Sequence, residues 1–158
     1  MTVADEAKIY VNALFDWTKE TGGTAVVVSN LKDLWEQAVI ASDKTRVLIC
    51  FAGEQARGSF SRAAATRRVD RQWQAAVTRG RGYASTRGNT LTDTVGNADS
   101  FYSVVEQVRD KIRALNNVSV EAPLDYKSTK PMSMGQLVVD GYLLEWSTAQ
   151  DLAQLTTT

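Results

Sequence analysis

The sequence contains no histidine, only one cysteine and no long apolar run, and these absences remove several classes of function. Histidine is the usual general base near neutral pH and the commonest metal ligand, so its absence excludes Ser–His and Cys–His hydrolysis. With a single cysteine no intrachain disulfide can form, and the apolar run around Cys50 predicts a buried, inert thiol. We therefore expect a protein that is not an enzyme and that uses no metal and no cofactor. An enzyme that uses Asp, Lys or Ser chemistry is the remaining alternative, and no residue pattern points to one.

The chain also lacks a membrane-spanning segment and a secretion signal. No stretch of about 18 apolar residues occurs, and the N-terminal sequence MTVADEAK has neither the basic region nor the apolar run of a signal peptide. The 158 residues, 44% of them apolar, suit one soluble domain. We expect this domain to span residues 1–150, with 151–158 as a disordered tail, and to be made in a cell's cytoplasm without membrane contact.

Hydrophobic periodicity predicts the following elements. Helices are expected from Val3 to about Glu20, ended by Gly22 and Gly23, from Leu31 to about Ala41, and from a cap at Asn97 or Asp99 through Leu115. Strands are expected at 24–29, 46–52, 67–78 and 136–146, with short extended segments at 118–124 and 126–129 and a weak helical turn from Thr148. This order indicates an α/β (α+β) domain with a single mixed or antiparallel β-sheet, helices packed on one face, and long flexible loops at 53–65, 80–82 and 85–96.

Acidic pairs and glycine motifs give no sign of chemistry. Asp5 and Glu6 lie in the first turn of a predicted helix, where the helix dipole accounts for them. Gly80 and Gly82 lack the spacing of a phosphate-binding loop and read as turn residues. Within the strand predicted at 67–78, Arg71 interrupts the apolar face.

The strongest local signal is positive charge. Between Arg57 and Arg87 there are eight arginines and one acidic residue, Asp70, although the whole chain carries no net charge. The arginines are Arg57, Arg62, Arg67, Arg68, Arg71, Arg79, Arg81 and Arg87. A planar guanidinium binds two oxygens at once, so this segment predicts a contact surface for carboxylates or phosphates. A solvated face without a partner is the simpler alternative.

Two kinds of partner remain open for the arginine segment. One is an acidic face of an identical neighbour, since the rest of the chain carries the compensating negative charge. The other is nucleic acid, for which the arginine segment would act as a binding module. Neutral net charge favours the identical neighbour, because duplex-binding domains usually carry a basic excess throughout.

The order of elements, with the segments RVLICFAGE, RRVDRQWQAAVTRGRGY, FYSVVEQVRDKIRAL and GQLVVDGYLLEWSTAQDL, resembles the tail terminator or neck proteins of long-tailed bacteriophages. The resemblance implies a structural virion protein that forms a homohexameric ring in the tail or neck. Such a ring caps the tail tube, binds the tail tube protein and joins the tube to the head-side connector protein. Another neck or head-closure ring is the nearest alternative, and the arginines could face a neighbour or DNA in the channel.

Overall fold

The computed structural model describes residues 1–38, 44–56, 66–80, 91–92, 100–115, 124–132 and 139–153. Its strands are β1 (Thr24–Val28), β2 (Arg46–Ala56), β3 (Thr66–Gly80), β4 (Leu124–Pro131) and β5 (Val139–Ala153). They form one sheet in the order β1-β2-β3-β5-β4. β1 runs parallel to β2 and every other pairing in this sheet is antiparallel. The predicted α+β fold with a mixed sheet is thus confirmed.

The helices of the described part are α1 (Val3–Ala13), α2 (Phe15–Thr21), α3 (Leu31–Ala38) and α5 (Phe101–Arg113). The single helix predicted from Val3 to Glu20 is divided at Leu14, whose ψ of 0° leaves the helical range. Gly22, with φ of 71°, ends α2 as expected. The predicted cap at Asn97 or Asp99 was wrong, because Ser100 accepts a hydrogen bond from the Ser103 amide and begins α5.

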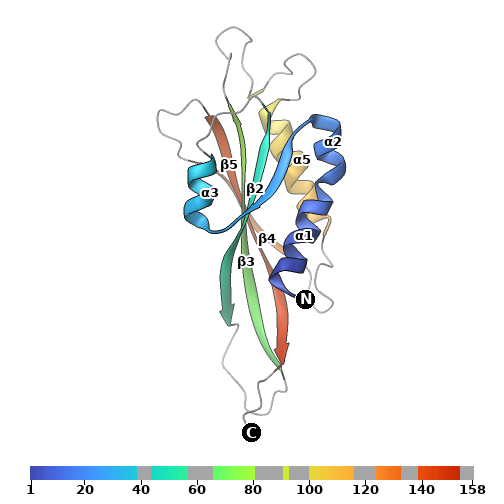
Figure 1. The fold of residues 1–158 in the computed structure, drawn as a ribbon, viewed down its shortest axis with the longest axis vertical. Coiled ribbons are helices and arrows are strands. Elements are labelled where there is room, and N and C mark those ends of the chain that lie inside the picture. The colour runs from blue at the N-terminus through green and yellow to red at the C-terminus, as the bar shows by residue number, and fades with distance from the viewer. Residues whose placement is uncertain are drawn as a thin grey trace.

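Helices lie on both faces of the sheet (Figure 1). α1, α2 and α5 pack on the face that carries Val47 and Ile49, whereas α3 packs on the face that carries Leu48 and Cys50. The expectation that all helices share one face therefore holds for α1, α2 and α5 but not for α3. The physical reason is the continuous apolar run of β2: successive side chains point to opposite faces, so both faces need a cover.

The long strands extend past the helices. Figure 1 shows the lower ends of β2, β3 and β5 continuing beyond α1 and α3. We call this extension the arm and define it as Gly53–Ala56, 66–71 and 148–153. The loop expected from Gly53 and the helical turn expected from Thr148 are both wrong, because ladder pairing with β3 continues through Ala56 on one side and Ala153 on the other. The tail expected at 151–158 begins too early, because β5 continues through Ala153, and Gly80, expected in a loop, is the last residue of β3. The rest of these loops at 57–65, 81–82, 85–90 and 93–96, and the tail from 154 to 158, lie outside the described residues.

Close packing at the start of β1 gives a test of the fold. A Cβ atom on Gly23 would lie 2.8 Å from Trp17 Cη2 and 3.0 Å from the Thr45 carbonyl oxygen, which accepts the Thr24 amide. We expect Gly23→Ala to lower the free energy of unfolding by about 1–3 kcal/mol, because the buried indole must move. Urea unfolding measures this change. Gly22→Asn is the matched control and should cost less, because Asn tolerates the left-handed backbone of Gly22; equal losses would contradict the packing explanation.

Candidate functional site

The structure describes the side chains of three of the eight predicted contact arginines. Arg57, Arg62, Arg81 and Arg87 lie outside the described residues, and of Arg67 only the backbone in β3 is described. Arg68 is exposed, Arg79 is half-buried and Arg71 is buried. The three side chains therefore meet three different environments.

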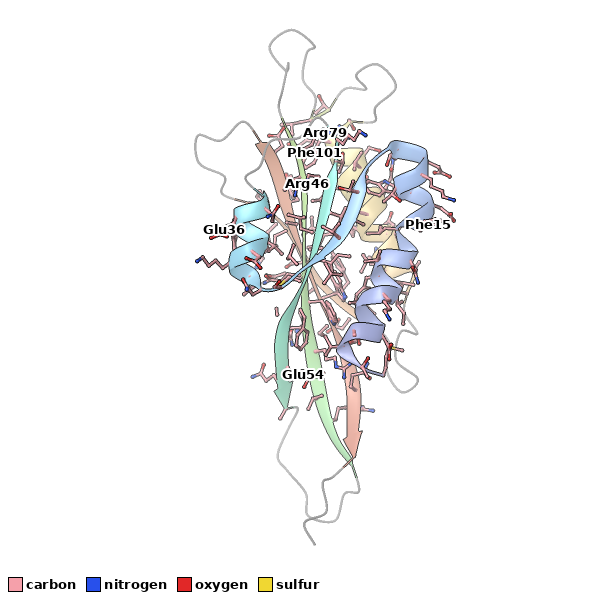
Figure 2. The ribbon with its side chains drawn as sticks, in the orientation of Figure 1. Phe15, Glu36, Arg46, Glu54, Arg79 and Phe101 are labelled. Carbon is pink, nitrogen blue, oxygen red and sulfur yellow. The ribbon has the colours of Figure 1, made fainter. Side chains whose placement is uncertain are left out.

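β3 separates these arginines instead of gathering them. Arg68 and Arg79 are eleven positions apart in one continuous 15-residue strand, which at about 3.3 Å per residue places their backbones roughly 36 Å apart. Figure 2 shows Arg79 beside Phe101 at one end of the molecule, with Glu54 toward the other. The arginines within β3 consequently do not form one continuous basic surface.

Arg79 is engaged within its own chain. Its Nε donates a hydrogen bond to Thr45 Oγ1 at 3.0 Å, and its guanidinium carbon lies 5.7 Å from the centroid of the Phe101 ring. The register places Arg79 directly opposite Asp140 on β5. These contacts join the end of β3 to Thr45, just before β2, and to the start of α5.

Arg71 forms the centre of a buried ionic network at the root of the arm. Only 4% of Arg71 is exposed, and none of Glu6. Arg71 Nη1 lies 3.5 Å from Glu6 Oε1, and Arg71 Nε donates to Glu54 Oε1 at 2.8 Å. One guanidinium thus lies between carboxylates from α1 and β2. A buried charge needs such partners, because removing it from water costs several kcal/mol.

Neutral hydrogen-bond donors bind the remaining acceptor positions of the Glu6 carboxylate. Tyr10 Oη donates to it at 2.9 Å, Thr148 Oγ1 lies 2.9 and 3.0 Å from its two oxygens, and Gln150 Nε2 donates at 3.1 Å. Tyr10 comes from the next turn of α1, whereas Thr148 and Gln150 come from β5. The network therefore fixes α1 against β3 and β5 at one point.

A β-bulge places Glu54 on the correct face of the sheet. The register shifts between Phe51 and Gly53, so that Glu54 pairs with Arg71 although Phe51 pairs with Trp73. Gly53 has φ of 120°, a conformation that favours glycine. Without the extra residue Glu54 would point to the opposite face, since side chains alternate along a strand.

Aromatic rings close the network on the side of the core. The Tyr10 ring meets Trp73 and Trp146 edge-on, at centroid distances of 5.0 and 5.1 Å. Burial, and secondly the negative charge of Glu6, raise the pKa of the Tyr10 hydroxyl far above its ordinary value. Tyr10 therefore stays protonated and remains a donor to Glu6.

The role of Glu6 was not predicted from the sequence. The helix dipole was expected to account for Asp5 and Glu6 alike, yet Asp5 is exposed while Glu6 is fully buried. Arg71 was the available signal, because a charged residue on the apolar face of a strand requires a buried partner. Nothing in the spacing of the sequence indicates that this partner lies 65 positions earlier.

Other candidate features give no further site within the described ranges. They contain no group of three or more His, Cys, Asp or Glu side chains that could hold a metal, and no helix long and apolar enough to cross a membrane. Cys50 is buried, and burial raises the pKa of its thiol. Trp17, Trp73 and Trp146 lie in the core, whereas Trp35 is 41% exposed.

No protein-family model matches this chain, and no curated protein matches it.

A double-mutant cycle on Glu6 and Arg71 tests the network. We expect Arg71→Met to lower the free energy of unfolding by about 3–5 kcal/mol, because it leaves Glu6 charged and buried without its cation. The double variant Glu6→Gln/Arg71→Met should lose much less than the sum of the two single losses. Urea unfolding supplies all four values. Additive losses would show that the two side chains act independently.

The raised pKa of Tyr10 predicts that the protein loses stability at alkaline pH. In the unfolded chain a tyrosine loses its proton near pH 10, whereas the folded protein keeps the Tyr10 proton because its pKa is raised. The contribution of Tyr10 to the free energy of unfolding is fully present below about pH 10. Above that pH the contribution falls by about 1.4 kcal/mol per pH unit. Tyr10→Phe should remove this loss, measured by urea unfolding from pH 9 to 11.5. Identical pH profiles for the wild type and Tyr10→Phe would contradict the assignment.

Proposed function

We propose that this protein is a structural subunit that assembles with copies of itself into a ring, in the tail or neck of a long-tailed bacteriophage. The ring would cap the tail tube and join it to the head-side connector. The proposal combines the resemblance of four sequence segments with one structural observation, which is the arm. It requires neither catalysis nor a cofactor.

The arm carries the proposal because it extends beyond the helices that cover the sheet (Figure 1). A sheet normally buries at least one face against another layer, and a few strands without such a layer are only marginally stable. In the arm Glu54, Gln55, Ala56 and Arg68 are exposed, whereas Val69, Ala149 and Gln150 are buried. The buried network holds the root of the arm, and a neighbouring subunit would cover the exposed side chains of β2 and Arg68.

Nucleic-acid binding is the second candidate. It depends on the segment from Arg57 to Arg87 acting as one basic surface. Within β3, Arg71 is committed to Glu6 and Glu54, and Arg79 contacts Thr45 and Phe101. These contacts favour assembly over nucleic acid as the proposed function.

The mass of the purified protein tests the proposal. We expect light scattering after size exclusion to give a mass near six subunits, the number that the resemblance implies, and negative stain to show closed rings. Added to polymerising tail tube protein, the rings should limit tube length. A monomer at every salt and protein concentration, without effect on tube length, would contradict the proposal. Binding to duplex DNA that weakens steeply with salt would support the second candidate instead.

A further inference from the structure

β1 is an edge strand without the usual protection of an edge. It pairs with β2 on one side and with no described strand on the other. Its sequence, TAVVV, contains no charge, proline or glycine. Val26 and Val27 are 46% and 49% exposed, one on each face of the sheet. Exposed apolar edges of this kind are prone to contact another chain.

β4, at the opposite edge of the sheet, has the protective features of an edge strand that β1 lacks. Its pairing with β5 shifts between Tyr126 and Ser128, which leaves Lys127 in a bulge. Lys127, Lys130 and Pro131 are exposed along the same strand. A bulge, lysines and a proline all oppose the addition of a further strand. This edge therefore offers side chains, and not backbone hydrogen bonds, to a partner.

The two edges carry opposite charge. From α2 to α3, acidic side chains exceed basic ones by two: Asp16, Glu20, Asp33 and Glu36 against Lys19 and Lys32. In the described residues of α5 and β4, basic side chains exceed acidic ones by two: Arg109, Lys111, Arg113, Lys127 and Lys130 against Glu106, Asp110 and Asp125. α2 and α3 both pack beside β1, and α5 packs beside β4. The two sides of the sheet are thus complementary to each other.

Some of these charges are already paired within the chain. Lys32 lies 3.7 Å from Glu36, and Asp110 lies within 4.0 Å of both Arg109 and Arg113. Glu20 and Asp33 near β1, and Lys127 and Lys130 on β4, have no ion-pair partner in the part of the chain that the structure describes. These four side chains are the available groups for a contact between edges.

We propose that the β1 edge of one subunit binds the β4 edge of a second copy, head to tail. This inference rests on the proposed ring and names its contact. The aliphatic stems of Lys127 and Lys130 would cover Val26 and Val27, while their ammonium groups reach Glu20 and Asp33. Because β1 and β4 are opposite edges of one sheet, each copy offers both surfaces. A repeated head-to-tail contact closes into a ring when the rotation between neighbours divides a full turn, as the proposed ring requires.

Charge reversal tests the contact. Glu20→Lys/Asp33→Lys makes both edges basic, and Lys127→Glu/Lys130→Glu makes both acidic. Each variant alone should fail to form rings, with a dissociation constant at least tenfold higher than that of the wild type, measured by light scattering across a dilution series. An equimolar mixture should form rings again, because the two variants can alternate around the ring. Lys8→Glu, at an exposed position on α1, is the control and should assemble like the wild type.

The outcomes separate this inference from the proposed function. If wild-type rings form and both charge-reversal variants also form them, the contact lies elsewhere and the proposed ring stands. If the wild type stops at a dimer, two β1 edges pair with each other and the head-to-tail contact is overturned. A wild type that stays monomeric overturns the contact together with self-assembly. Far-ultraviolet circular dichroism of each variant excludes loss of folding as the cause.

Discussion

The buried pair of Arg71 and Glu6 is the interaction on which the rest of the structure depends. Arg71 lies in β3, directly between Glu54 of β2 and Thr148 of β5, and Glu6 approaches from α1. Four elements that are distant in the sequence therefore meet at one guanidinium. Leaving Arg71 or Glu6 buried without its partner would cost several kcal/mol, so folding favours the arrangement that brings these elements together.

This constraint also fixes the register of the long strands. A slip of one residue along β3 would turn Arg71 to the other face of the sheet, away from Glu6. The bulge at Gly53 serves the same requirement, because it returns Glu54 to the face of Arg71. On one side of the network Trp73 and Trp146 belong to the apolar core, and on the other the strands continue as the arm. The network thus marks the boundary between a body stabilised by hydrophobic packing and an arm that projects from it.

Local patterns predicted the elements, and failures occurred where a distant contact decided the outcome. The β-branched run at β1, the apolar run of β2 and the periodicity of α5 were readable because each signal lies within one element. The strand was expected to end at Trp146 and a weak helical turn to follow from Thr148, yet the side chains of Ser147, Thr148 and Gln150 in β5 are buried and two of them bind Glu6. Likewise the eight arginines formed one group by sequence position, although β3 carries Arg68 and Arg79 to opposite ends and buries Arg71 between them. Charge counted along a strand therefore says little about charge on a surface.

In the proposed ring, the sheet edges and the arm would have different roles. One edge is apolar and the opposite edge is basic, and one ionic network joins the arm to the body. The edges would join neighbouring subunits, and the network would set the direction in which the arm projects toward the next component.

The central claim, that Glu6 and Arg71 couple the arm to the body, is tested most directly by amide hydrogen exchange of Glu6→Gln against the wild type. The account predicts faster exchange at 69–73 and 148–150, with the amides that join β1 and β2 unchanged. A uniform increase over the whole sheet, or no increase at these positions, would contradict it.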